Sequence, residues 1–327
     1  MSLADGNRAE SRASGDCSRR LLDMPVLSGE DARTPGWERD ALAGFALQVG
    51  DDAFPCLFAR KAWNSNTMRF AFIAGTGQEK IDGFIETLSA YTDFVHSVPS
   101  EERLMTPLVT FFNAYPRGPA GTLHALGWDI LNEAHRRDPA PWPGSVPLSP
   151  DHPDWCFCFN GVQLFVNMSS PEHRVLRNRN LGQYLTFVIN PRENFDIVAS
   201  LSNRSGRLVR NNIRSRVAAW NGGVIPPELG FYGEEDNREW TQYQLHEDAV
   251  PRPSKCPFRS RAGLHSSLPA GRHPIHDVNR PADEVRQADT VSSSLESIDE
   301  QSEFTNARPA GNDRCNDHNG NSRLFCT

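Results

Sequence analysis

The chain has 327 residues, a net charge of −7 and an isoelectric point near 5.8. This acidic balance argues against a protein that binds nucleic acid without sequence preference. No apolar run approaches the roughly 20 residues that a membrane helix needs, and the first residues lack the apolar centre of a signal peptide. The sequence therefore predicts a cytoplasmic protein that does not span a membrane.

The first third of the chain predicts a tail followed by helices and strands. Residues 1–35 are polar, lack periodicity and are expected to form a disordered tail. Apolar residues at helical spacing predict a helix over residues 38–49. Two alternating apolar runs, residues 54–60 and 68–73, flank a polar patch and predict a hairpin. An amphipathic helix is expected over residues 78–97.

A short strand and a second helix come next. Residues 106–112 are rich in β-forming side chains, and residues 122–136 have an apolar stripe at helical spacing. The helix should end before Pro139, because a proline disfavours helical geometry in the residue before it. The proline-rich residues 139–153 then predict a rigid loop.

The central stretch holds three predicted strands. Residues 155–159 and 162–168 are joined by Asn160-Gly161, a pair typical of a tight hairpin turn. A third apolar run covers residues 184–189. Together with the preceding elements, these strands predict one α+β domain with a largely antiparallel sheet and packed helices.

The last third predicts a helix and a long tail. Residues 206–220 are expected to be helical, and from residue 251 onward the apolar residues become isolated. Such a segment cannot bury enough surface to offset the entropy lost on ordering. We therefore place the domain at residues 36–250 and expect residues 251–327 to be disordered.

A histidine and three arginines stand between the second and third central strands. They are His173, Arg174, Arg177 and Arg179. A neutral imidazole can be an axial ligand of heme iron, and arginines can pair with the heme propionates. The pattern is equally typical of a solvated surface turn. It thus indicates either an anion-binding pocket or an exposed loop.

Other side chains offer alternatives to His173. His124 and His135 are eleven residues apart on the predicted helix, so they share one face. Cys156 and Cys158 point to the same face of their strand and are expected to be buried thiols rather than zinc or heme ligands. A cationic substrate would need a carboxylate, and the sequence does not rank the candidates Asp138, Asp151, Glu172, Glu193 and Asp196.

Many short motifs in one order resemble the YqcI/YcgG family. They cover roughly residues 45–248 and leave both tails outside. The motifs are Phe54-Pro-Cys-x-Phe-Ala-Arg60, Leu123-His-x-Leu-Gly-Trp128, His135-x-x-Asp-Pro139, Asp154-Trp-x-Phe-Cys-Phe159, Ser170-Pro-x-His173, Arg177-x-Arg-x-Leu-Gly182, Asn190-Pro-Arg192 and Glu239-Trp-x-Gln-Tyr243.

The resemblance implies a reaction class that composition and spacing do not supply. The family members whose activity is understood look like heme proteins that hydroxylate a guanidine nitrogen, including arginine N-hydroxylases of antibiotic pathways such as cycloserine biosynthesis. It thus implies heme b, O₂, an external electron donor and a small guanidino substrate, with L-arginine as the expected one. His173 becomes the expected axial ligand, with His124 and His135 as alternatives and Arg174, Arg177 and Arg179 as cofactor-binding residues.

Two other functions remain open on the sequence. The protein could bind or sense heme without turnover, or it could bind an anionic metabolite without any heme. A Soret absorption band would exclude the heme-free function, and turnover of arginine would separate an enzyme from a sensor.

Overall fold

The computed structural model describes residues 21–23, 36–115, 118–198, 204–230 and 232–260. The predicted tails lie outside the described residues, apart from residues 21–23 at one end and residues 251–260 at the other. Within the described residues, no helix combines the length and the apolar character needed to cross a membrane.

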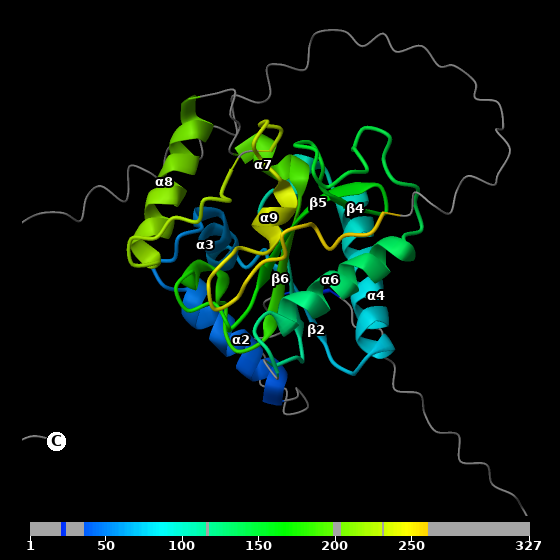
Figure 1. The fold of residues 1–327 in the computed structure, drawn as a ribbon, viewed down its shortest axis with the longest axis horizontal. Coiled ribbons are helices and arrows are strands. Elements are labelled where there is room, and N and C mark those ends of the chain that lie inside the picture. Colours follow the sequence, from blue (N-terminus) through cyan, green and yellow to red (C-terminus); the bar gives the residue numbers. More distant parts are fainter. Residues whose placement is uncertain (1–20, 24–35, 116–117, 199–203, 231, 261–327) are drawn as a thin grey trace, which may run out of the picture. The chain divides into compact units, whose positions relative to one another are not determined.

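The described part of the chain forms one sheet with helices on both faces (Figure 1). The sheet has six strands in the order β1-β2-β3-β6-β5-β4. The strands are β1 (Leu22–Asp23), β2 (Arg69–Ile73), β3 (Leu108–Phe112), β4 (Phe157–Phe159), β5 (Val162–Ser169) and β6 (Leu185–Pro191). The helices are α2 (Gly36–Val49), α3 (Leu57–Asn64), α4 (Gln78–Ser97), α5 (Ser100–Arg103), α6 (Thr122–Arg136), the 3₁₀ turn η1 (Arg177–Arg179), α7 (Arg192–Val198), α8 (Arg204–Trp220) and α9 (Glu239–Tyr243).

The strand pairing confirms the predicted α+β class with a largely antiparallel sheet. Only β2 and β3 pair in parallel among the described strands, and α4 and α5 lie between them in the chain. The hairpin between β4 and β5 is also confirmed. Its turn residues Asn160 and Gly161 have φ values of 50° and 75°, which a two-residue turn of this hand requires.

Alternate side chains of the strands fill two cores, one on each face of the sheet. On one face, Phe112 and Phe187 pack against α4 and α6 together with Phe84. On the other face, Phe70 and Phe111 pack against α2, whose Phe45 contacts both rings edge-on. Figure 1 shows α4 and α6 on one side of the sheet and α2, α3 and α8 on the other.

The predicted hairpin at residues 54–60 and 68–73 is wrong in its first half. Residues 57–64 form α3, and β2 pairs with β1 and β3 instead. Cys56 caps this helix, because its sulfur accepts a hydrogen bond from the Ala59 amide at 3.4 Å. Phe58 and Ala62 are four residues apart and so share one face of the helix. The apolar run therefore follows helical periodicity, although its short length resembles strand alternation.

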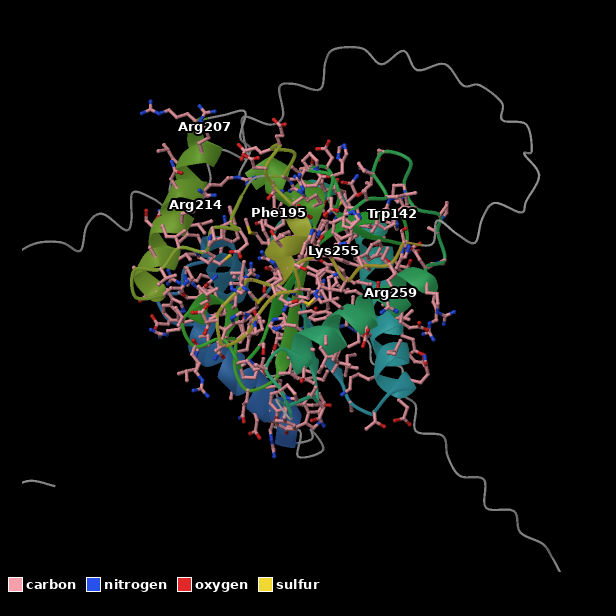
Figure 2. The ribbon with its side chains drawn as sticks, viewed as in Figure 1. Trp142, Phe195, Arg207, Arg214, Lys255 and Arg259 are labelled. Atoms are coloured by element: carbon pink, nitrogen blue, oxygen red, sulfur yellow. The ribbon has the colours of Figure 1, made fainter. Side chains whose placement is uncertain are left out.

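Two short segments of the predicted tails belong to the fold. Leu22 pairs with Phe70 at the edge of the sheet. Near the other end, Phe258 is 7% exposed and packs at an angle against rings that include Trp155 and His135. The Asn132 side chain on α6 also bonds both to the Pro257 carbonyl and to the Arg259 amide. Residues 251–260 are thus held against the α6 side of the sheet, and Figure 2 labels Lys255 and Arg259 on this segment.

Candidate functional site

A cavity of about 270 Å³ lies on the sheet face opposite α4 and α6. This volume is slightly below the range of about 300–1,000 Å³ that is usual for small-molecule sites. Side chains from α2, α3, α7, α8, α9, η1 and the strands β5 and β6 line it. Figure 2 labels two lining residues, Phe195 on α7 and Arg214 on α8.

Strand alternation decides which side chains of β5 reach the cavity. Leu164, Val166 and Met168 belong to the core under α4 and α6, whereas Phe165 and Asn167 line the cavity. Asn167 is paired in register with Val188 of β6, which lines the cavity as well. The sheet thus forms the floor of the site, and the helices form its walls.

The cavity walls carry more positive than negative charge. Four arginines line it, and Glu239 is the only acidic residue among the described residues that do so. The arginines are Arg179, Arg192, Arg210 and Arg214. The remaining walls are mainly apolar or aromatic. Such a site favours an anionic group among the cations and an apolar body against the aromatic rings.

Arg192 and Glu239 form a buried ion pair inside this site. Arg192 Nε lies 3.2 Å from Glu239 Oε2, and both side chains are almost fully buried. The Arg192 guanidinium also stacks on the Tyr232 ring at 4.0 Å from its centre. Tyr243 donates a hydrogen bond to Glu239 Oε1 at 3.1 Å. The carboxylate and the ring together show that this corner of the cavity can hold a guanidinium group.

Arg179 is buried, and no described residue forms an ion pair with it. Its side chain is 3% exposed, and one terminal nitrogen donates to the Gln242 carbonyl at 2.9 Å. Within the described residues, Nε and Nη1 have no hydrogen-bond partner. Burial lowers the pKa of Arg179 to about 10, so the side chain stays charged at neutral pH. A buried cation with open donors costs free energy unless an anion completes it.

The three predicted arginines do not converge on one point. Arg174 and Arg177 are exposed, and the Arg177 guanidinium lies over the Trp220 ring at 4.9 Å. Only Arg179 lines the cavity. Because the 3₁₀ turn η1 rotates successive side chains, arginines that are neighbours in sequence point in different directions.

His173 is fully buried beside a carboxylate. Its Nδ1 lies 3.2 Å from Glu247 Oε2, and Nε2 has no hydrogen-bond partner in the described part of the chain. Burial lowers the pKa of His173, and Glu247 only partly opposes this shift. The ring is therefore neutral, so that Nδ1 donates its hydrogen to Glu247 and Nε2 carries a lone pair. This is the arrangement of many metal-ligating histidines, yet His173 does not line the cavity.

Glu247 holds the loop that contains His173. Its two oxygens accept hydrogen bonds from the amides of Arg174, Val175 and Leu176 at 3.0–3.1 Å. Burial alone would raise the pKa of Glu247, but these amides and His173 lower it below its ordinary value. The carboxylate is thus an internal anchor for the chain that leads into η1.

The two alternative histidines on α6 are separated by the fold. His124 lies with its ring centre 5.3 Å from that of His173. Burial lowers the pKa of His124 to about 3, so its ring is neutral. His135 instead packs between Trp142 and Phe258. Both histidines are buried on the inner face of α6, and neither lines the cavity.

The structure brings forward residues that the sequence did not single out. Cys56 and Glu239 both line the cavity, although each occurs only inside a longer motif. Asp138, Asp151, Glu172 and Glu193 do not line it. Cys156 and Cys158 are buried on the far edge of the sheet, as predicted. Among the described residues, no group of three or more histidine, cysteine or acidic side chains could hold a metal ion.

Comparisons with known proteins agree with the motifs. The YqcI/YcgG family matches residues 45–259. A protein of Streptomyces lavendulae named "Putative N(omega)-hydroxy-L-arginine synthase DcsA" is 41% identical over 228 residues, which are 69% of this chain and 85% of the relative. The uncharacterized protein YcgG of Bacillus subtilis is 33% identical, over 68% of this chain and 88% of that protein.

A second Bacillus subtilis relative, the uncharacterized protein YqcI, is 30% identical over 70% of this chain and 91% of its own length. No solved structure matches the chain. The family match covers the whole cavity wall from Phe45 to Gln242. The chain therefore belongs to the YqcI/YcgG family.

Proposed function

We propose that this protein is a heme-dependent oxygenase that hydroxylates a guanidino nitrogen, with L-arginine as substrate. The observation that carries the proposal is the 41% identity, over 85% of the relative, to the protein named "Putative N(omega)-hydroxy-L-arginine synthase DcsA". The family resemblance adds a role in antibiotic biosynthesis of the cycloserine type to this proposal. The reaction would consume O₂ and two electrons from an external donor.

The chemistry of the cavity fits heme. Its walls are largely apolar, as a macrocycle requires, and Arg179 presents open buried donors that suit a propionate. Arg210 and Arg214 on α8 would supply further positive charge. When bound, heme would supply the activation of O₂, which no amino-acid side chain provides.

Glu239 and Tyr232 support a guanidino substrate. They already hold the guanidinium of Arg192 by an ion pair and a ring contact. A substrate guanidinium of the same shape would bind the carboxylate in the same way, since two parallel hydrogen bonds match a carboxylate to a guanidinium. In this role Glu239 orients the nitrogen that reacts, and the aromatic side chains exclude water around it.

The axial ligand expected from the family resemblance is His173. Its open Nε2 and its Nδ1 contact to Glu247 support the role. The complete burial of His173 away from the cavity wall argues against this role. The four arginines also favour the second candidate function, an anionic-metabolite binder without heme.

Mass spectrometry of arginine incubated with the heme-loaded full-length protein, a reductant and O₂ tests the proposal. We expect a product heavier by one oxygen atom, which carries the label when ¹⁸O₂ is used. The variant Glu239→Gln keeps the side-chain shape and should raise KM for arginine. A Soret band without product would indicate a heme carrier or sensor, and the absence of a Soret band would indicate the metabolite binder.

A further inference from the structure

A cysteine that the predicted ligand set does not use faces the cavity. Cys56 lies at the N-terminus of the eight-residue helix α3 and is half-buried. Phe54, Pro55 and Phe58 line the cavity around it. A thiol is a small side chain, and its position at the rigid start of a helix fixes where the sulfur lies.

The Cys56 sulfur is buried and contacts the backbone at the start of α3. The Ala59 amide donates a hydrogen bond to the sulfur at 3.4 Å, and the start of α3 presents its backbone amides to it. Burial raises the pKa of the Cys56 thiol, although amides and the charge of Arg179 act in the opposite direction. The thiol therefore stays protonated until a cation binds, and a bound metal ion removes the proton from a coordinating thiol.

Arg179 gives a second, independent indication of a ligand in the same place. It lines the same cavity, is 3% exposed, and leaves Nε and Nη1 without a hydrogen-bond partner within the described residues. The guanidinium donors of Arg179 would bind an anion, whereas the Cys56 sulfur would bind a soft metal ion. Heme combines both in one molecule, since it carries iron at its centre and carboxylates at its edge.

His173 meets these conditions less well. Its side chain has no exposed surface, its ring packs against His124, and neither ring borders the cavity. Because the His173 side chain has no exposed surface, an iron atom could reach its Nε2 only if surrounding residues moved. An iron atom at Cys56 would lie in space that the fold already leaves open.

We propose that Cys56 is the axial ligand that binds heme iron as a thiolate, and that Arg179 binds a propionate of the same heme. This inference rests on the heme dependence of the proposed function. On binding ferric heme, the sulfur–hydrogen bond breaks, its electron pair is donated to iron, and the proton leaves to solvent without a change of oxidation state. A thiolate ligand donates electron density that favours cleavage of the O–O bond.

The test compares three variants of the full chain after titration with ferric heme. Cys56→Ser removes the soft ligand but keeps a side chain that caps helices well, so α3 should persist by circular dichroism. His173→Ala removes the rival ligand. Cys256→Ser is the matched control, because Cys256 is also partly buried but does not line the cavity. The readout is the absorption spectrum of the ferrous–carbon monoxide complex, which separates thiolate from imidazole ligation.

We expect a thiolate-type spectrum in the wild type, in Cys256→Ser and in His173→Ala, and its loss in Cys56→Ser. A second measurement does not depend on a variant: heme should protect Cys56 from iodoacetamide while leaving the labelling of Cys256 unchanged. An imidazole-type spectrum that survives in Cys56→Ser and is lost in His173→Ala would overturn the inference but not the proposed function. A wild type that binds no heme would overturn both.

Discussion

Replacement of Arg179 by alanine separates a ligand-binding arginine from a merely structural one. Arg179 lines the cavity, and its Nε and Nη1 have no hydrogen-bond partner within the described residues, so a propionate there would receive charge-assisted hydrogen bonds. One such bond contributes about 1.5–3 kcal/mol. The loss corresponds to a fall of about ten- to a hundredfold in heme affinity, because about 1.4 kcal/mol is a factor of ten.

The same substitution should act differently on the protein without heme. Wild-type Arg179 is charged, 3% exposed and without an anionic partner among the described residues, so its burial costs free energy. Its removal relieves this cost and forfeits one hydrogen bond to Gln242, worth about 1 kcal/mol. We therefore expect the free energy of unfolding of the heme-free protein to stay the same or to rise.

Arg177→Ala is the matched control, because Arg177 is exposed, two residues away, and stacked on Trp220. It should leave heme affinity within about threefold of the wild type, since an exposed contact contributes little. Absorbance titrations give the affinities, and urea unfolding gives the stabilities. Equal heme affinity in Arg179→Ala and Arg177→Ala would refute the assignment of Arg179 to the anion.

Three further results follow from buried groups. Phe258→Ala should lower the free energy of unfolding, measured in urea, by about 3–5 kcal/mol. A chain truncated after residue 260 should keep the wild-type value. If Phe258→Ala lowers it by less than about 1 kcal/mol, residues 251–260 do not stabilise the domain. The pKa of His124 falls from 6.5 to about 3 on folding, so its contribution to stability is complete above pH 6.5 and is lost as the pH falls below that value. Between pH 7 and pH 5 the wild type should lose about 2 kcal/mol more than His124→Asn, and equal losses would contradict a neutral buried ring. Glu247→Gln should weaken the amide contacts that hold residues 174–176 and increase their hydrogen exchange, with Glu235→Gln as an exposed control that leaves the exchange unchanged.

The long helices and central strands could be predicted because local pattern and tertiary packing agree there. The structure gives α4 and α6 with the predicted bounds, and their apolar stripes lie on the sheet. The strand predicted at residues 54–60 was wrong because the local pattern there is ambiguous. This segment has too few apolar residues to distinguish strand alternation from a helical face. The Cys56 sulfur caps the helix that forms there.

The predicted end of the domain at residue 250 came too early, because the composition of the next residues is misleading. Composition describes the average of a segment, and residues 251–260 resemble a tail on average. One aromatic ring anchors this segment to the domain, because Phe258 packs between Trp142, Trp155 and His135. Burial of one large ring can offset the entropy of ordering the short segment that carries it.

The candidate site shows why sequence neighbours are a poor guide to which side chains meet. His173, Arg174, Arg177 and Arg179 drew attention because they cluster within seven positions, yet only Arg179 reaches the cavity. The side chain that shares the cavity with it, Cys56, lies more than a hundred residues earlier in the chain. One local signal could have pointed to it, namely a cysteine directly after Pro55 and before a helix. A helix N-terminus stabilises the thiolate form of a cysteine. This signal could be used only if residues 57–64 were first predicted to be helical.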